Sequence, residues 1–212
     1  MNLPVFCYLF KNHEQLNEAL RSLILSKEQI SKGVNASNVG GWHSQRDLAH
    51  WEDECIKTIM TFIIERVRMV SSQCGDVMNN RQKWRIIAWA NVNRYGDYNK
   101  LHNHITYPKE RNQSPLVDEK PIPLWSGVYY VDLGICEKPS QVGCIGFQES
   151  HSDSLKTVKI VPKRGLILLF PSSLNHEVMP YLGKSERISI SFNAYYQDDM
   201  TLPQNHNTIS IY

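Results

Sequence analysis

Apolar residues in the first part of the chain recur with the spacing of amphipathic helices. Residues 13–31 and 47–72 place apolar side chains three or four positions apart, and the longer segment carries charges on its opposite face. A short apolar segment, residues 3–10, precedes them and predicts a strand at the N-terminal edge. We expect residues 1–80 to form a helical support that covers the outside of a sheet.

From residue 84 onward the pattern changes to that of short strands. In residues 84–95 and 187–193 apolar and polar side chains alternate, so each strand has one apolar and one polar face. Four further segments have the pattern of strands: residues 125–132, 143–148, 156–161 and 166–170. Six short strands separated by turn residues predict a mainly β protein, either a sandwich or a jelly roll.

Composition and charge narrow the class of protein. The 212 residues are 42% apolar and 21% charged, which is typical of a globular protein. A net charge of +2 does not indicate a general nucleic-acid or membrane binder. We find neither a transmembrane run nor a signal peptide, and five scattered cysteines without a CxxC pair fit a cytoplasmic protein. Nothing in the sequence indicates an oligomeric state.

Three histidines are candidate metal ligands. His102 and His104 form a His-x-His pair, and both side chains share one face if the chain there is extended. His176 follows the buried apolar run 166–170 after a short polar turn. Imidazoles are common metal ligands, and three of them on one side of a metal leave positions open for a co-substrate and dioxygen.

The polar face of the last alternating strand is a candidate anion site. Arg187 and Ser189 share this face, and a guanidinium can clamp a carboxylate through two hydrogen bonds. The alternative is a surface ion pair of Arg187 with Glu186 or Asp198, which requires this face to be exposed. Asn93, on another alternating strand, either lines the site or satisfies backbone groups at the strand end.

A long connection begins directly after the histidine pair. Residues 105–124 contain four prolines and charges of both signs. Connections of this length are usually lids or disordered segments. We interpret this one as a lid whose Lys109 and Arg111 meet the substrate.

At this point the order of the residues resembles a known family. The landmarks are Tyr95-Gly96, His102-x-His104, Tyr129 to Asp132, Gly143, Phe147, Pro162, Gly165, Phe170, His176, Gly183 and Arg187-x-Ser189. This order resembles the iron(II)/2-oxoglutarate-dependent dioxygenases, in particular the prolyl-4-hydroxylase-like branch. An oxygenase family common in marine bacteria and their phages looks closer still, sharing the phrases WANVN and SGVYY. The resemblance covers roughly residues 84–196.

The resemblance implies a fold and an activity. The fold is a double-stranded β-helix (jelly roll) with N-terminal helices packed on the outside. Within a single domain of residues 1–212, the catalytic core would span 84–196 and a tail 197–212. The activity is hydroxylation of a small-molecule or peptide substrate, with Fe(II), 2-oxoglutarate and O2, releasing succinate and CO2.

The resemblance also implies roles for individual residues. His102 takes the first iron-ligand position and His176 the last. Arg187 takes the position that pairs with the distal carboxylate of 2-oxoglutarate, with the Ser189 hydroxyl beside it. Tyr129 or Tyr130 would donate to the same carboxylate, depending on the register of their strand.

The chain departs from the family pattern at one ligand. The pattern is His-x-Asp/Glu, and here His104 occupies the carboxylate position. Three neutral imidazoles leave the full charge on Fe(II). His104 is then either a third metal ligand or a residue that supports the ligands or contacts the substrate. In the second case Asp97, Asp118 or Glu119 could supply the anion.

Two other functions remain open on sequence grounds. One is a three-histidine metal dioxygenase that does not use 2-oxoglutarate. The other is a catalytically silent jelly roll with a binding or structural role.

Two groups of residues are expected to lie outside the site. We expect the other histidines to be surface residues; they are His13, His43, His50, His151 and His206. We expect Trp89 and Trp125 to belong to the core.

Overall fold

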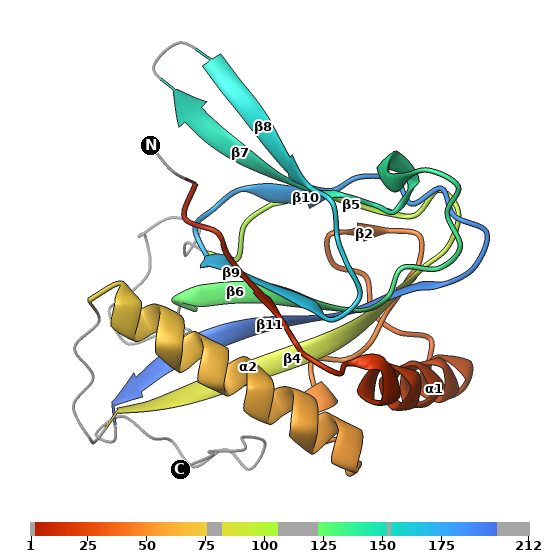
Figure 1. The fold of residues 1–212 in the computed structure, drawn as a ribbon, viewed down its shortest axis with the longest axis horizontal. Helices are drawn as coiled ribbons and strands as arrows, with labels where there is room; N and C mark the ends of the chain where they lie inside the picture. Colours follow the sequence, from red (N-terminus) through yellow and green to blue (C-terminus); the bar gives the residue numbers. More distant parts are fainter. Residues whose placement is uncertain (1–2, 76–81, 106–122, 152–153, 199–212) are drawn as a thin grey trace, which may run out of the picture.

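The computed structural model describes residues 3–75, 82–105, 123–151 and 154–198, which form two antiparallel sheets facing each other (Figure 1). Among these residues the larger sheet has six strands: β1 (Phe6–Leu9), β3 (Trp42–His43), β4 (Gln82–Asn93), β6 (Trp125–Asp132), β9 (Leu166–Pro171) and β11 (Arg187–Asp198). The smaller has five: β2 (Asn38–Val39), β5 (Tyr98–His102), β7 (Ile145–His151), β8 (Ser154–Ile160) and β10 (His176–Val178).

The strand orders are those of a double-stranded β-helix. They run β1-β9-β6-β11-β4-β3 in the larger sheet and β2-β5-β10-β7-β8 in the smaller. Strands that follow one another in sequence, such as β9, β10 and β11, thus alternate between the two sheets. The predicted mainly β jelly roll is confirmed, and so is the N-terminal edge strand, which pairs with β9 as β1.

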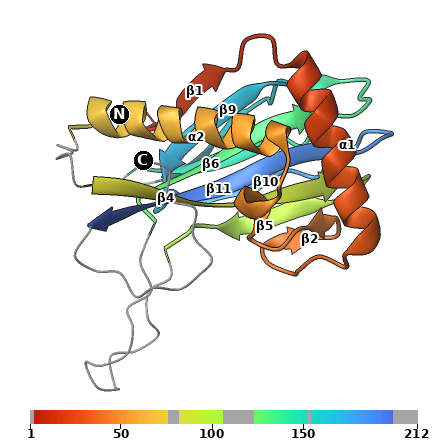
Figure 2. The same ribbon diagram turned by 90° about the horizontal axis from the view of Figure 1, so that it is seen from below.

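Two helices cover the outer face of the larger sheet, α1 (Glu14–Ile30) and α2 (Glu54–Gln73), as Figure 2 shows. The helix expected from residue 47 begins later than predicted. A 3-10 turn, η1 (Leu48–His50), precedes it, and the Asp53 carboxylate accepts a hydrogen bond from the backbone N–H of Cys55 at 2.9 Å. This N-cap satisfies a donor that the first helical turn leaves free, so α2 begins at Glu54. None of the described helices could span a membrane.

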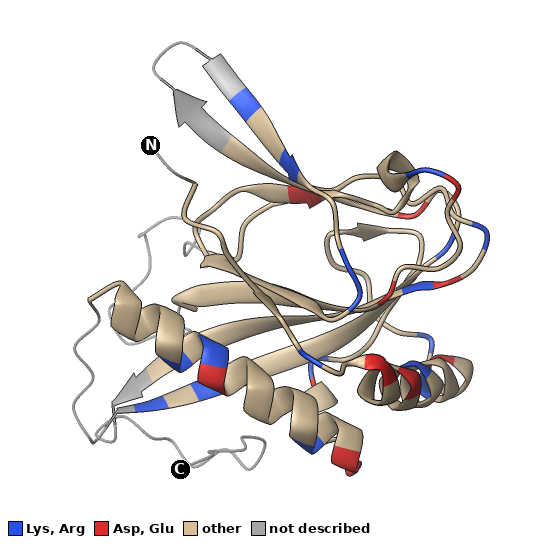
Figure 3. Ribbon diagram, viewed as in Figure 1, with Lys and Arg blue, Asp and Glu red and all other residues tan. Residues whose placement is uncertain are grey.

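The alternation along β11 divides its side chains between two environments. Ile188, Ile190 and Phe192 are fully buried in the core beneath the helices, and each such side chain contributes roughly 1.5–3 kcal/mol. Arg187 and Ser189 point into the space between the sheets. Figure 3 shows most charged residues on the helices and outer loops, so a buried arginine between the sheets is an exception.

The hydrophobic pattern missed the strands that hold the histidines. β5 has a largely polar sequence and β10 is three residues long, so neither has an apolar period to detect. At the other end, β11 continues to Asp198, beyond the expected boundary at 196. A short 3-10 turn, η2 (Pro139–Gln141), precedes β7. The rest of the expected tail and most of the expected lid, residues 106–122, lie outside the described residues.

Candidate metal centre

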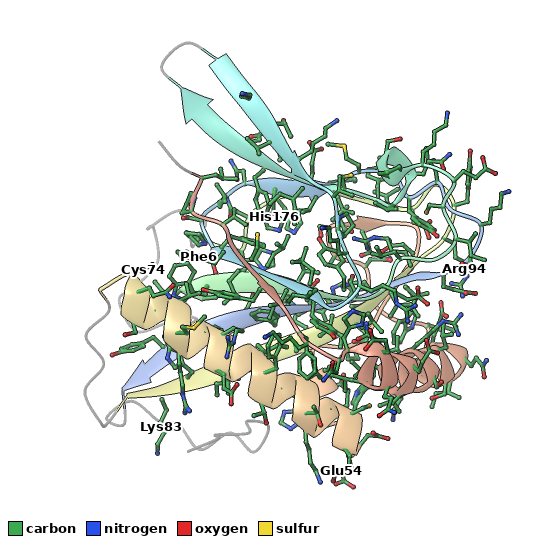
Figure 4. The ribbon with its side chains drawn as sticks, viewed as in Figure 1. Phe6, Glu54, Cys74, Lys83, Arg94 and His176 are labelled. Atoms are coloured by element: carbon green, nitrogen blue, oxygen red, sulfur yellow. The ribbon has the colours of Figure 1, made fainter. Side chains whose placement is uncertain are left out.

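Pairing within the smaller sheet brings the three histidines together. His102 ends β5 and His176 begins β10, and the antiparallel register places them opposite each other. Their ring centroids are 4.3 Å apart. The backbone N–H of His104 donates to the carbonyl of Ser172 at 2.9 Å, which holds the third imidazole beside the first two. Figure 4 shows His176 in the space between the two sheets.

Each of the three imidazoles brings one ring nitrogen into a common cluster. Nε2 of His104 and Nε2 of His176 are 3.3 Å apart, and one nitrogen from each of His102, His104 and His176 lies within 4.8 Å of the others. Nitrogen atoms that bind one metal at about 2.1 Å lie roughly 3.0–3.4 Å apart in octahedral or tetrahedral geometry, and the His104–His176 separation falls in this range.

Hydrogen bonds on the opposite ring nitrogens fix the tautomers. Nδ1 of His102 lies 2.7 Å from the carbonyl of Lys100, and Nδ1 of His176 lies 2.9 Å from that of Leu174. Nδ1 of His104 lies 2.6 Å from Oδ1 of Asn193. These oxygens only accept, so each Nδ1 carries the proton and each Nε2 keeps its lone pair. That is the arrangement a divalent metal requires, so the residues fit a metal.

Burial keeps these imidazoles neutral. Burial, followed by the neighbouring histidines, lowers the pKa of His176 to about 3. Burial and the nearby His102 lower the pKa of His104 to about 4, and burial lowers the pKa of His102. At neutral pH the site therefore presents three uncharged ligands.

No carboxylate joins this cluster among the described residues. The Asp97 carboxylate accepts from the backbone N–H of Arg94 at 2.6 Å and packs against Gly40 and Gly41. The hypothesis that Asp97 supplies an anion is therefore wrong. The alternative carboxylates, Asp118 and Glu119, lie outside the described residues.

Arg187 lies in the same cavity of ≈ 610 Å³ as the histidines. It is only 2% exposed. Nε donates to the carbonyl of Val142 at 3.0 Å, Nη1 to Oδ1 of Asn93 at 3.1 Å and Nη2 to the carbonyl of Gly143 at 3.3 Å. A guanidinium has five N–H donors, so these bonds leave one N–H on each terminal nitrogen.

No carboxylate neutralises Arg187 within the part of the chain that the structure describes. Glu186 is instead paired with Arg21 and Arg94, so a surface ion pair between Arg187 and Glu186 is excluded. Burial lowers the pKa of the guanidinium, yet arginine remains charged in proteins. A buried cation without an anion is costly, and a bound anionic ligand would remove that cost.

Two polar side chains accompany this guanidinium. The ring of Tyr130 lies 5.3 Å from it, and the Tyr130 hydroxyl is buried without a hydrogen-bond partner among the described residues. Ser189 also lines the cavity. The free N–H groups of Arg187, the Tyr130 hydroxyl and Ser189 are suitable donors for one carboxylate.

The register of β6 separates the two candidate tyrosines. Tyr129 points away from the cavity into the core beneath the helices, where its hydroxyl donates to Oδ1 of Asn17 at 2.7 Å. A role for Tyr129 at the co-substrate is therefore wrong, because adjacent strand residues face opposite sides. Asn93 does line the cavity and contacts Arg187, as expected for a site residue.

Two residues assigned elsewhere by sequence lie in the wall of the cavity. His43 is 3% exposed and its ring stacks on Trp89 at 5.5 Å between centroids. Trp89 stacks in turn near His104, at 6.0 Å. The expectation of a surface position for His43 is wrong, and Trp89 is buried at the site rather than in the main core. Trp125 is a core residue, as predicted.

Other site residues were missed or cannot be placed. Asn193 shares the polar face of β11 with Arg187, and that periodicity could have identified it. Arg46 and His43 reach the cavity from a loop and a two-residue strand, which give no periodic signal. The expected lid residues Lys109 and Arg111 lie outside the described residues.

Comparisons with known proteins bear on the family resemblance and on the fold. Residues 119–193 match the family model described as "Putative 2OG-Fe(II) oxygenase". The matched segment includes His176 and Arg187 but not the His102/His104 pair. A comparison of the sequence with curated proteins finds no match.

Solved structures share the fold over most of their length. A Pseudomonas putida prolyl-4-hydroxylase is 14% identical with a TM-score of 0.65, covering 92% of this chain and 93% of that one. A Trichoplax adhaerens prolyl hydroxylase, solved with a hypoxia inducible factor peptide fragment, is 15% identical with a TM-score of 0.59, covering 91% and 83%. HygX from Streptomyces hygroscopicus, solved with nickel and 2-oxoglutarate, is 11% identical with a TM-score of 0.59, covering 91% and 83%.

The family match and the fold confirm the resemblance seen in the sequence. Over the matched segment and in its architecture, the chain is recognised as similar to the prolyl-4-hydroxylase-like 2-oxoglutarate/iron(II) oxygenases, which are oxidoreductases.

Proposed function

We propose that the protein is an iron(II)/2-oxoglutarate-dependent dioxygenase that hydroxylates a small-molecule or peptide substrate and releases succinate and CO2. One observation carries the proposal. A single cavity contains three convergent neutral imidazoles and a buried guanidinium that has no carboxylate partner among the described residues. The first set suits a divalent metal and the second suits a dicarboxylate that also reaches that metal.

Each group of residues has a distinct task in this proposal. His102, His104 and His176 would hold iron through Nε2, while Arg187, Tyr130 and Ser189 would hold the far carboxylate of 2-oxoglutarate. When bound, iron and 2-oxoglutarate supply the oxidising chemistry, in which decarboxylation of the keto acid is coupled to reduction of dioxygen.

The apolar wall behind the metal ligands would limit the access of water. Phe170 lies 4.7 Å from the ring of His176 and 5.0 Å from that of Phe147, measured between centroids. Both phenylalanines are at most 2% exposed. A dry environment strengthens the electrostatic hold on ligands and protects reactive species from side reactions.

The ligand set also supports a second candidate. Because His104 replaces the usual carboxylate, the site resembles a three-histidine dioxygenase that does not require 2-oxoglutarate. The two candidates differ in the role of Arg187 and Tyr130, which only the first needs for its co-substrate.

The test is an anaerobic titration of the apoprotein with Fe(II) and then 2-oxoglutarate, following the weak visible charge-transfer band of a chelated keto acid. We expect the band in the wild type. We expect Tyr130→Phe to bind 2-oxoglutarate about tenfold more weakly, because a hydrogen bond to a charged group is lost. Tyr129→Phe is the matched control, since its hydroxyl contacts Asn17 outside the cavity, and it should leave 2-oxoglutarate affinity unchanged.

Arg187→Ala and His104→Ala extend the test. Arg187→Ala should abolish the band while iron still binds, and circular dichroism would verify that this buried variant is folded. His104→Ala should weaken iron binding itself. Iron binding without a band in the wild type would favour the 2-oxoglutarate-independent enzyme, and absence of iron binding would leave a silent jelly roll.

A further inference from the structure

The cavity has a second arginine that the metal and the co-substrate do not use. Arg46 follows β3 and lines the cavity, but its side chain is exposed, whereas Arg187 is buried. The two guanidinium groups therefore differ in depth. The buried one suits a co-substrate that must be held away from water, and the exposed one is accessible to a group that arrives from solvent.

Contacts with the aromatic wall hold Arg46 near the metal ligands. Its guanidinium carbon lies 5.2 Å from the ring centroid of Trp89, a cation–π contact. The Trp89 ring in turn lies 6.0 Å from that of His104. The guanidinium is thus no farther from the His104 ring than the sum of these two distances, so a group held by Arg46 lies on the part of the wall that adjoins the metal ligands.

Arg46 has no acidic partner in the described part of the chain. The positive charge of Arg46 acts on both His43 and His104 and, after burial, contributes to the lowered pKa of each imidazole. The carboxylate of the adjacent Asp47 instead accepts from the indole N–H of Trp51 at 3.3 Å. Within the described ranges no hydrogen bond or ion pair occupies the five N–H donors of Arg46, so they can serve a ligand.

The charge of the whole cavity favours the same kind of ligand. Among the described residues that line it, Arg46 and Arg187 are the cations, and none is Asp or Glu. Iron(II) and the 2-oxoglutarate dianion would cancel each other, so the two arginines leave a net positive charge. With His104 in place of a carboxylate, the described lining supplies no negative charge to offset it, and an anionic substrate is attracted.

We propose that Arg46, held by Trp89, binds an anionic group of the substrate, a carboxylate or a phosphate, at the mouth of the cavity. The inference rests on the proposed function and deepens it by naming the substrate class. Arg46 is then a specificity-determining residue that places an anionic molecule with a C–H bond directed at the metal.

Matched probes that differ in charge test this inference. Butyrate and butyramide have the same shape, and propylphosphonate tests a phosphate-like group. Each probe is titrated into zinc(II)-loaded protein saturated with 2-oxoglutarate, and binding is followed by saturation-transfer NMR. The 2-oxoglutarate occupies the Arg187 site, and the zinc(II) protein cannot turn over. We expect butyrate or propylphosphonate to bind about fivefold more tightly than butyramide, the most that an exposed ion pair usually provides. The tighter of the two anions indicates the natural group.

Variants locate the effect at Arg46. Arg46→Gln should abolish the preference for the anions, and Arg46→Lys should retain part of it. Lys100→Gln removes the same charge from an exposed residue of β5 outside the cavity and should change nothing. Equal binding of acid and amide, absence of binding, or retention of the preference in Arg46→Gln would overturn the inference.

The failure of this inference and that of the proposed function can be told apart. The charge-transfer band of the iron(II) protein is recorded first, without any probe. A missing band contradicts the 2-oxoglutarate proposal whatever the probes do. A normal band without a difference between acid and amide contradicts only the role of Arg46.

Discussion

Acidification should destabilise the metal-free protein through its buried histidines. In the unfolded chain a histidine has a pKa near 6.5, whereas burial lowers the pKa of His104 to about 4 and of His176 to about 3. At pH values between the folded and the unfolded pKa, the unfolded chain binds protons that the folded protein does not. The free energy of unfolding therefore falls as the pH drops below 6.5.

The size of the effect follows from the pKa shifts. Lowering the pH from 7.5 to 5.5 reduces the free energy of unfolding by about 1.4 kcal/mol for each of the two imidazoles. The lower pH is one unit below the pKa of an unfolded histidine, and one unit corresponds to that energy. His104 and His176 together cost about 3 kcal/mol, and the lowered pKa values of His102 and His43 act in the same direction. For a chain of this size the melting temperature should fall by roughly 6–12 °C.

The assay is thermal unfolding of the chelator-treated protein at a series of pH values and constant ionic strength. His104→Asn removes one of the two groups whose pKa is strongly lowered, so the decrease in stability between pH 7.5 and 5.5 should be about half as large. His50→Gln changes an exposed histidine, and this control should show the same decrease in stability as the wild type. A melting temperature that does not change between pH 7.5 and 5.5, or an unchanged loss in His104→Asn, would refute the reasoning.

Three further substitutions probe the site and its scaffold. Asn193→Ala removes the acceptor of His104 Nδ1 and should weaken zinc(II) binding about 10–100-fold in a competitive chelator titration. Asn17→Ala leaves the Tyr129 hydroxyl and the Val131 carbonyl without their buried partner, so urea unfolding should show a loss of about 3 kcal/mol with zinc affinity unchanged. Gly127→Ala would bring a methyl group against Phe192 and the Leu168 carbonyl, and we expect a loss of about 2 kcal/mol in the same assay.

Periodicity in the sequence was sufficient to predict five of the six strands that the larger sheet has among the described residues, all except the two-residue β3. The alternation along β11 correctly separated Ile188 and Ile190 from Arg187 and Ser189, because one face of that strand packs on helices and the other lines a cavity. The division of the chain into a helical support, a catalytic core and a tail stays a prediction, as does the cytoplasmic location.

The smaller sheet could be predicted only in part. The segments expected at residues 143–148 and 156–161 are its strands β7 and β8, whereas β2, β5 and β10 were missed. β5 and β10 are short and have few apolar residues, and their positions depend on pairing between distant segments. The contact of His43 with Trp89 likewise joins a two-residue strand to β4. Such contacts are set by tertiary packing, so no local pattern contains them.

The surroundings of His104 explain why an imidazole occupies the position where the family pattern has a carboxylate. Oδ1 of Asn193 faces the His104 ring and also accepts from the Ser126 hydroxyl at 2.9 Å, which is itself 2.7 Å from the hydroxyl of Ser172. This network presents an acceptor to residue 104, and a protonated Nδ1 satisfies it. An aspartate there would place two acceptors against each other and would not reach as far as Nε2 does. His104 and the strand that supports it therefore form one unit, and the packing around β11 favours an imidazole over a carboxylate at position 104.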